Sequence, residues 1–215
     1  MALIYLLILR SNKRVLEIIP IAFLAVALGS GLILPFILRD EYANIFCITI
    51  AIALFAYYEY SVHELTKKDQ LTGLLNRHAY YADVNNDTKN ITSLISIDMN
   101  GLKTINDTEG HTAGDEALVT LSICFTRATK FRQIAYRVGG DEFVIVCRKT
   151  SEEDVLNLVE RIRKQVNDTR YSCSIGYSFN FEGNKSVDDL LTESDAMMYD
   201  DKEKYYRESG KERSV

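Results

Sequence analysis

The sequence predicts an α/β (α+β) protein whose central, mainly antiparallel sheet is flanked by helices and preceded by a two-helix apolar hairpin. Two observations indicate the hairpin: the first 62 residues are rich in Leu, Ile, Ala, Phe and Tyr, and most of the charge follows residue 63. A third indicates the domain: from about residue 70, patterns typical of strands alternate with patterns typical of helices.

The apolar hairpin consists of residues 15–38 and 42–62, and each run is long enough for a bilayer-crossing helix of about 20 residues. The linker of three residues makes the two helices antiparallel, so their outer ends share one side. The basic residues on that side are Arg10, Lys13, Arg14, Lys67 and Lys68. Because basic residues favour the cytoplasmic side, we expect a multi-pass protein of the cell inner (cytoplasmic) membrane with a cytoplasmic domain. The alternative is a buried hairpin inside a soluble domain.

The elements expected after the hairpin follow the order β-α-β-β-α-β, with extra helices. Helices are expected at 78–84, in two pieces within 102–129, from 151 to about 167, and from 186 onward. Strands are expected at 91–98, 133–138, 143–147 and 171–179. This order is that of a ferredoxin-like split βαβ sheet.

Glycines and capping residues set the expected boundaries. Gly110 and Gly114 mark the break between the two helices of the third segment. Ser151 followed by Asp154 has the pattern of a helix N-terminus, and Ser186, followed closely by two aspartates, begins the last helix in the same way.

Charge and cysteine usage argue against two functional classes. The net charge is −5, the pI is about 5.3, and no dense Lys/Arg block is present, so we expect no binding to nucleic acid. The cysteines are scattered without zinc-ligand spacing, and we interpret them as packing residues: Cys47, Cys124, Cys147 and Cys173.

Acidic residues stand at two strand ends. The apolar strand 94–97 ends in Asp98, and Gly139-Gly140-Asp141-Glu142 forms a hairpin turn between two strands. If those strands are adjacent, Asp98 and Asp141 converge, and their carboxylates can bind Mg²⁺ for two-metal phosphoryl transfer. The alternative is a tight turn with solvated acids.

Four stretches match the motifs of one family in order and spacing. They are 69–77 (DQLTGLLNR), 98–107 (DMNGLKTIND), 110–115 (GHTAGD) and 137–143 (RVGGDEF). With them the chain resembles the GGDEF family of diguanylate cyclases, which implies a palm-type domain. The expected parts are 1–14 (apolar stub and basic flank), 15–62 (membrane hairpin), 63–68 (stalk), 69–207 (GGDEF domain) and 208–215 (tail).

The resemblance implies the catalytic residues and the metal ligands. Asp98, the carbonyl of Met99 and Asp141 would hold Mg²⁺ (or Mn²⁺), with Glu142 supporting the metal site. Asp141 would also be the general base for the attacking 3′-hydroxyl, and Lys103 would stabilise charge on the transferring phosphate.

The resemblance also implies the substrate-binding residues. The turn that includes Leu102 would wrap the triphosphate with backbone N–H groups, and the side-chain-free Gly139 and Gly140 let the substrate approach closely. Asn106 and Asp115 would read the guanine edge, which favours GTP over ATP. In the last helix, Lys202 would contact the terminal phosphates.

The sequence departs from the family pattern at several positions. Asn100 replaces the second acid of its block, Leu102 replaces a phenylalanine, and Tyr206 replaces an arginine that is present one place later as Arg207. Residues 130–133 lack the RxxD motif of the family's product-inhibition site, so we expect no tight feedback inhibition there.

The resemblance implies that two GTP molecules condense into cyclic di-GMP with release of two pyrophosphates. Each protomer of a homodimer would hold one GTP. Two alternatives stay open: a degenerate module that binds GTP or acts as a membrane-bound scaffold, and a cyclase that uses ATP or mixed nucleotides. The second would fit better with a small residue in place of Asp115.

Overall fold

The computed structural model describes residues 67–209, together with residues 26, 29, 48, 50–55, 57 and 58. The chain divides into two compact units, Met1–Thr66 and Lys67–Val215. Nearly all described residues belong to the second unit, and the fold below is that of this unit.

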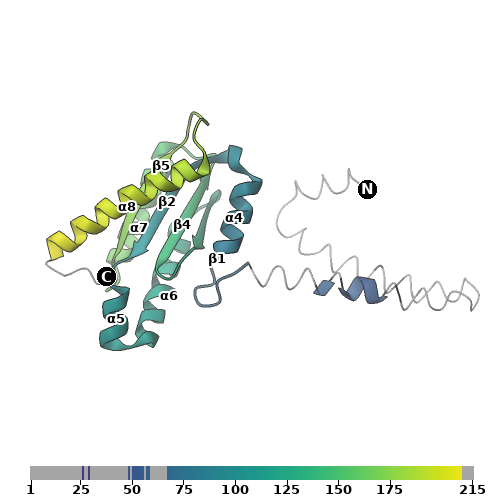
Figure 1. The fold of residues 1–215 in the computed structure, drawn as a ribbon, viewed down its shortest axis with the longest axis horizontal. Helices are drawn as coiled ribbons and strands as arrows, with labels where there is room; N and C mark the ends of the chain where they lie inside the picture. Colours follow the sequence, from purple (N-terminus) through teal and green to yellow (C-terminus); the bar gives the residue numbers. More distant parts are fainter. Residues whose placement is uncertain are drawn as a thin grey trace, which may run out of the picture. The chain divides into compact units, whose positions relative to one another are not determined.

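The second unit is an α+β domain (Figure 1). In chain order its elements are β1 (Leu75–Asn76), α4 (Arg77–Asn86), η2 (Thr88–Asn90), β2 (Ile91–Met99), α5 (Leu102–Glu109), α6 (His111–Ala128), β3 (Gln133–Arg137), β4 (Glu142–Arg148), α7 (Glu152–Asn167), β5 (Cys173–Phe179) and α8 (Val187–Ser209).

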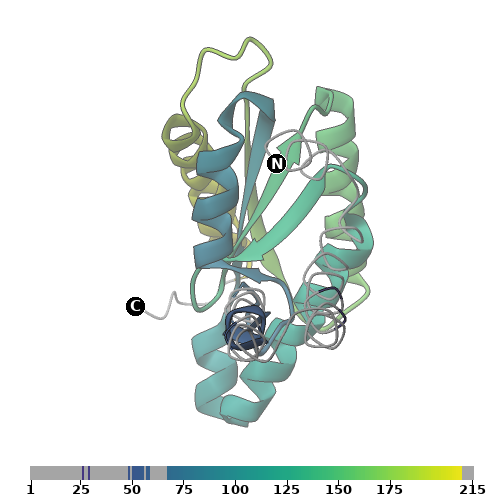
Figure 2. The same ribbon diagram turned by 90° about the vertical axis from the view of Figure 1, so that its right-hand side faces the viewer.

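The five strands form one mixed sheet in the order β1-β3-β4-β2-β5. β1 runs parallel to β3, and the other neighbouring pairs are antiparallel. Helices α4 and α8 cover one face of the sheet, and α6 and α7 cover the other (Figure 2). The predicted sheet flanked by helices is therefore confirmed, and strand β2 lies inside it between β4 and β5.

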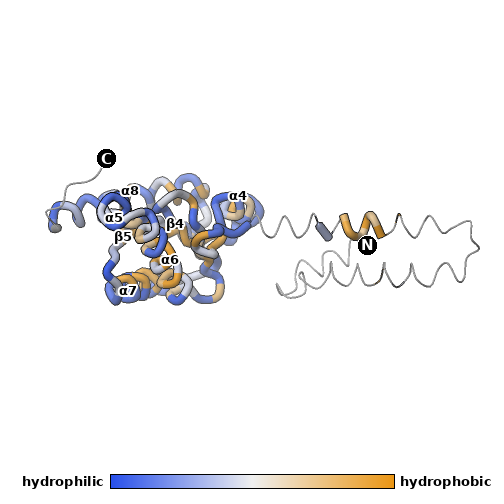
Figure 3. The backbone as a smooth tube through the Cα atoms, turned by 90° about the horizontal axis from the view of Figure 1, so that it is seen from below, coloured by the Kyte–Doolittle hydropathy of each residue, from blue (hydrophilic) through white to orange (hydrophobic). Residues whose placement is uncertain are grey.

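Strand β2 is buried because a hydrophobic cluster packs against each of its two faces. Ile95 and Ile97 pack with α6 and α7, whereas Leu94 packs with α4 and α8, and all three are 0% exposed. The strand predicted at 91–98 is therefore confirmed as β2, with apolar side chains on both faces. Figure 3 shows that the buried strand β4 is hydrophobic and that the C-terminal part of α8 is hydrophilic.

Two details of the prediction are corrected. Gly114 does not break the helical segment, because it lies inside α6; Gly110 alone separates α5 from α6, with φ of +88°. Strand β1 was not predicted, since its two residues are too few to show a periodic pattern. The capping box at Ser151 and Asp154 is confirmed.

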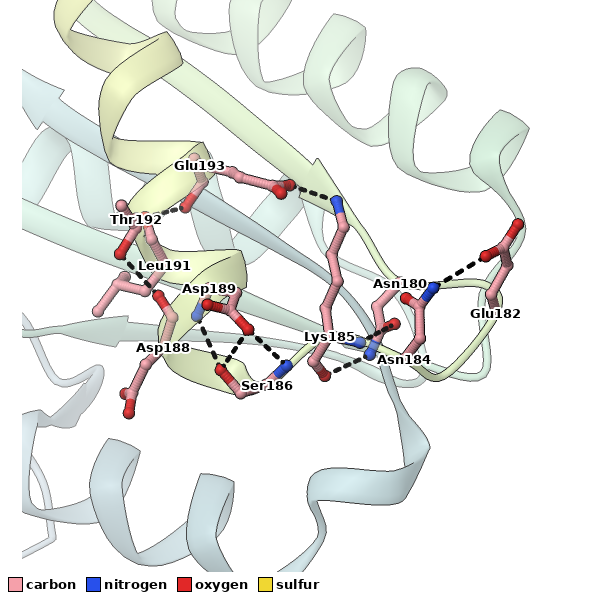
Figure 4. Close-up of polar contacts among 11 residues, drawn as sticks. Asn180, Glu182, Asn184, Lys185, Ser186, Asp188, Asp189, Leu191, Thr192 and Glu193 are labelled. Atoms are coloured by element: carbon pink, nitrogen blue, oxygen red, sulfur yellow. Dashed lines mark hydrogen bonds and ion pairs between the residues drawn. The ribbon is translucent and has the colours of Figure 1, made fainter.

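The last helix begins at a second capping interaction (Figure 4). Ser186 Oγ accepts a hydrogen bond from the N–H of Asp189 at 3.1 Å, and the Asp189 carboxylate accepts from the N–H of Ser186 at 3.0 Å. The preceding loop is held by Asn180, whose side chain bonds the backbone of Lys185 in both directions. These contacts fix where α8 starts on the sheet.

Helix α8 lies directly on strand β5. A Cβ at Gly176 would be 2.1 Å from the carbonyl oxygen of Ser194 and 2.2 Å from the N of Met198, so only glycine fits there. The outward N–H groups of β5 are also occupied by α8: that of Ile175 donates to Asp201 at 2.9 Å, and that of Tyr177 meets the sulfur of Met197 at 3.4 Å.

The predicted inner-membrane location is contradicted. In the parts of the chain that the structure describes, no helix combines the length and the apolar character that crossing a bilayer requires. The described residues of the predicted hairpin are 26, 29, 48, 50–55, 57 and 58, and they are helical. The rest of the predicted hairpin, 15–38 and 42–62, lies outside the described residues.

Candidate active site

A buried carboxylate lies near the end of the interior strand β2. Asp98 is 6% exposed. In the sheet register it is opposite Glu142 on β4 and Ser174 on β5. Its Oδ1 atom accepts a hydrogen bond from Nζ of Lys202 on α8 at 2.7 Å. The acid at the strand end is thus paired with a cation from the last helix.

The environment of Asp98 disfavours its ionised form. Burial raises the pKa of this carboxyl above its ordinary value, and the Asp141 and Glu142 carboxylates raise it further, whereas Lys202 lowers it. Because like charges act on Asp98 only at short range, the three acids share one region. The site therefore has a surplus of negative charge that favours the binding of a cation.

The turn between β3 and β4 is hydrogen-bonded to the end of β2. The N–H groups of Val138 and Gly139 donate to the carbonyl of Glu142 at 3.0 and 3.3 Å. The carbonyl of Asp141 accepts from the N–H of Met99 at 3.0 Å. The structure therefore brings together the four residues assigned to the metal: Asp98, Met99, Asp141 and Glu142.

The two glycines of the turn have different surroundings. A Cβ at Gly139 would lie 2.5 Å from Oε2 of Glu142, so the Glu142 side chain folds back over the turn. Nothing lies within 4 Å of a Cβ at Gly140. The backbone of the turn is thus approachable at Gly140 and covered by a carboxylate at Gly139.

The ion pair between Arg137 and Asp69, which the sequence does not predict, holds the turn between β3 and β4 in place. Arg137 donates to the carbonyl of Gly140 through Nε at 3.2 Å and through Nη2 at 2.7 Å, and its Nη1 pairs with Asp69 Oδ1 at 2.9 Å. Asp69 also accepts from the N–H and the hydroxyl of Thr72. Asp69 lies in the motif 69–77 and Arg137 in the motif 137–143, yet their separation of 68 residues gives no local signal of the contact.

The residues assigned to guanine lie on neighbouring helices. A Cβ at Gly114 would be 2.0 Å from Oδ1 of Asn106, so the Asn106 side chain of α5 rests on the backbone of α6 at Gly114. Asp115 is the next residue of α6 and is exposed. The absence of a side chain at Gly114 thus lets Asn106 approach α6 one residue before Asp115.

The first turn of α5 follows a left-handed glycine. Gly101 has φ of +73°, which redirects the chain from the end of β2 into the helix. Leu102 packs against the core, so only its backbone is available to a substrate, and Lys103 is exposed. The preceding Asn100 is buried: its Oδ1 accepts from the Ser174 hydroxyl at 2.9 Å, and its Nδ2 has no hydrogen-bond partner.

The donor set fits a hard divalent cation, although three acidic side chains do not form a cage. Within residues 67–209, no group of three or more His, Cys, Asp or Glu side chains is arranged to hold a metal ion. Two carboxylates, Asp98 and Asp141, and the carbonyl of Met99 would nonetheless offer oxygen ligands to such an ion. Mg²⁺ commonly uses one or two carboxylates and completes its shell with water and substrate phosphates.

The C-terminal departure from the family pattern lies on α8. Tyr206, at the place of the expected arginine, is half-buried and meets the ring of Tyr205 edge-on at 5.3 Å, and Arg207 is exposed. Lys202 is therefore the cation from this part of α8 that reaches Asp98.

The described cysteines are packing residues, as predicted. Burial raises the pKa of the Cys147 and Cys173 thiols to about 12, and that of Cys124 is also raised. None of the three forms a disulfide. Protonated thiols are poor nucleophiles and poor metal ligands. Cys47 lies outside the described residues.

Known proteins similar to this chain share its domain. A diguanylate cyclase of Vibrio cholerae is 33% identical over 152 residues, covering 64% of this chain and 47% of the relative. Diguanylate cyclase DosC of Escherichia coli is 35% identical over 157 residues, covering 66% of this chain and 34% of the relative. The chain thus spans less than half the length of these curated relatives.

Solved structures show the same fold. The coiled coil and GGDEF domain of DgcB from Caulobacter crescentus, in complex with c-di-GMP, has a TM-score of 0.69 and 22% identity and covers 77% of this chain and 96% of its own. The GGDEF domain of TpbB from Pseudomonas aeruginosa has a TM-score of 0.56 and 27% identity, over 64% and 89%. The model of the family described as diguanylate cyclase, GGDEF domain, matches residues 66–207. The chain therefore belongs to the GGDEF diguanylate cyclase domain family.

Proposed function

We propose that this chain is a diguanylate cyclase that converts two GTP into cyclic di-GMP and two pyrophosphates, with residues 69–207 as its catalytic domain. The observation that supports the proposal is the hydrogen bond from the Met99 N–H to the Asp141 carbonyl, which joins the Gly-Gly turn to the end of the strand that carries buried Asp98. The two acids can hold a divalent cation that a nucleoside triphosphate needs, and nothing lies within 4 Å of a Cβ built at Gly140.

The proposed reaction forms one P–O bond and breaks another at each α-phosphate. The 3′-hydroxyl of one nucleotide attacks the α-phosphate of the other, and pyrophosphate leaves. Asp141 takes the hydroxyl proton, and Lys103 stabilises the charge on the transferring phosphate. Asp98, the Met99 carbonyl and Asp141 would hold Mg²⁺ or Mn²⁺, with Glu142 in support; when bound, the cation neutralises phosphate oxygens.

The proposed active form is a homodimer. One site holds one GTP, and the second nucleotide has to be presented by another copy of the chain, because two 3′-hydroxyls attack two α-phosphates. The rate of product formation should therefore rise more steeply than linearly with protein concentration below the dissociation constant of the dimer.

Guanine is selected by Asn106 and Asp115 in this proposal. A carboxylate at Asp115 accepts from the N1–H and the N2 amine of guanine, and adenine lacks this pair of donors. A site built to hydrogen-bond such groups discriminates by about 10⁴-fold or more when they are absent. The adjacency of Asn106 and Gly114 supports a shared base site on α5 and α6.

Product analysis of the full chain tests the proposed function. The chain is incubated with GTP and Mg²⁺, and then with GTP and a tenfold excess of ATP, and the products are identified by mass spectrometry. We expect cyclic di-GMP and pyrophosphate in both cases, with no adenine-containing dinucleotide. GTP binding without pyrophosphate release in a dimeric preparation would contradict the proposal and favour a GTP-binding scaffold.

Replacing Arg137 with Met should lower the rate of cyclic di-GMP formation by about tenfold to a hundredfold, because a small misplacement of a catalytic turn has effects of that size. Arg137 fixes the Gly140 carbonyl through two N–H groups. Arg137→Lys keeps a charge for Asp69 but loses the paired N–H groups, and its rate should be intermediate. Initial rates at saturating GTP provide the measurement. A wild-type rate in Arg137→Met would show that the hydrogen bonds from Arg137 to the Gly140 carbonyl are not needed for catalysis.

A further inference from the structure

Lys202 and Asp98 form an ion pair in a largely buried setting. Their atoms Nζ and Oδ1 are 2.7 Å apart, and the two side chains are 16% and 9% exposed. The residues come from α8 and β2, 104 positions apart in the chain. A carboxylate this deeply buried is costly without a cation, and Lys202 supplies that cation here.

The same carboxylate is the one that the proposed function assigns to the metal. An ammonium and a divalent cation that touch one buried carboxylate would repel each other strongly at low dielectric. Lys202 and the metal therefore compete for Asp98. A metal ion that arrives alone has to displace the ammonium and leave it without its anionic partner.

The backbone of α8 at this position is held in place. The neighbouring Asp201 accepts from the N–H of Ile175 at 2.9 Å and pairs with Arg163 of α7 at 3.1 Å. Gly176 and Ser194 fix the same helix closer to its start. An exchange at Asp98 thus needs only a rotation of the long Lys202 side chain about a fixed helix.

We propose that Lys202 is an exchangeable counter-ion of Asp98, which yields the carboxylate to the metal only when a nucleotide triphosphate arrives with it. The triphosphate gives the released ammonium a new anionic partner, whereas a free metal ion does not. Metal and nucleotide then bind with positive coupling, and the coupling depends on Lys202. This inference rests on the proposed function, since it takes the metal to bind at Asp98.

Binding of Mn²⁺ to the full chain tests the exchange by calorimetry, with and without the non-cleavable analogue α,β-methylene GTP. In wild type, Mn²⁺ alone should bind weakly and the analogue should tighten it strongly. Lys202→Met removes the competing charge and keeps the apolar stem. Its affinity for Mn²⁺ alone should rise about tenfold or more, which corresponds to the loss of one charge-assisted hydrogen bond. The tightening by the analogue should shrink by a similar factor.

A matched control lies two residues further on the same helix. Lys204 is 68% exposed and pairs only loosely with Glu208, at 3.9 Å, so Lys204→Met should leave Mn²⁺ binding unchanged. Introducing Asp98→Asn into Lys202→Met should remove the gained affinity. If Lys202→Met unfolds in a thermal melt, Lys202→Gln takes its place under the same criteria.

The outcomes separate the exchange from the proposed function. Unchanged or weaker binding of Mn²⁺ alone to Lys202→Met overturns the exchange, while cyclic di-GMP formation by wild type would still uphold the function. If no variant binds Mn²⁺ even with the analogue, the metal site at Asp98 and the exchange both fail.

Discussion

Replacing Asp141 with alanine should abolish cyclic di-GMP formation, with a loss of about 10³-fold or more in rate, because one substitution removes the proposed general base and a metal ligand together. The fold should survive, since the turn is held by backbone groups of Val138, Gly139 and Met99 and by Arg137, none of which uses the Asp141 side chain. Rates measured by mass spectrometry and thermal unfolding of the same sample provide the two readouts.

Two further variants sharpen this result. Asp141→Asn keeps the size of the side chain and should be as inactive as alanine, which assigns the effect to charge. Glu160→Ala, an exposed acid on α7, should have wild-type rates. Residual activity of Asp141→Ala above about one per cent of wild type would exceed what water could supply in place of a general base, and our assignment of the base would then be wrong.

Gly176→Ala in β5 should lower the free energy of unfolding substantially. The new Cβ would meet backbone atoms of α8, at Ser194 and Met198, and backbone cannot rotate out of the way as a side chain can. Overpacking of this kind costs about 3 kcal/mol, which for a chain of this size lowers the melting temperature by about 6–12 °C. Because α8 has to shift, Lys202 moves with it, and nucleotide binding should weaken as well.

Ser178→Ala is the matched control on the same strand. Ser178 is 3% exposed, lies two residues from Gly176, and its hydroxyl has no hydrogen-bond partner. Removing an unsatisfied buried hydroxyl is expected to be neutral or slightly stabilising. Calorimetric unfolding of the two variants side by side measures the difference. Equal melting temperatures for Gly176→Ala and wild type would mean that α8 does not rest on β5 as closely as described.

The sequence predicts elements whose signals are local and periodic. The strand 91–98 has an apolar run, and the helix after Ser151 has both halves of its capping box, so each could be placed to within a residue or two. Gly114 misled the prediction because its role is not conformational. It makes room for Asn106, and a contact between two helices leaves no trace in the pattern of either one.

The acids of the candidate site could be proposed from the sequence, but the ion pairs that basic residues form with acids there could not. The acids at 98 and 141 stand at strand ends, and the adjacency of β2 and β4 followed from the expected topology. The ion-pair partners could not be predicted from the sequence. Lys202 meets Asp98 across 104 residues and Arg137 meets Asp69 across 68, and no periodicity connects such distant positions.

The occupied N–H groups of β5 bear on how two copies of this chain can associate. A bare outer strand is a template onto which a second molecule can add its own strand, and such growth has no natural end. Here Asp201 and Met197 already take the donors that an incoming strand would need. At the opposite margin, β1 has two residues and is bridged at Leu75 by Lys68. In the described domain, the β5 edge of the sheet is therefore closed to a strand from a second copy, and any association there has to use other surfaces.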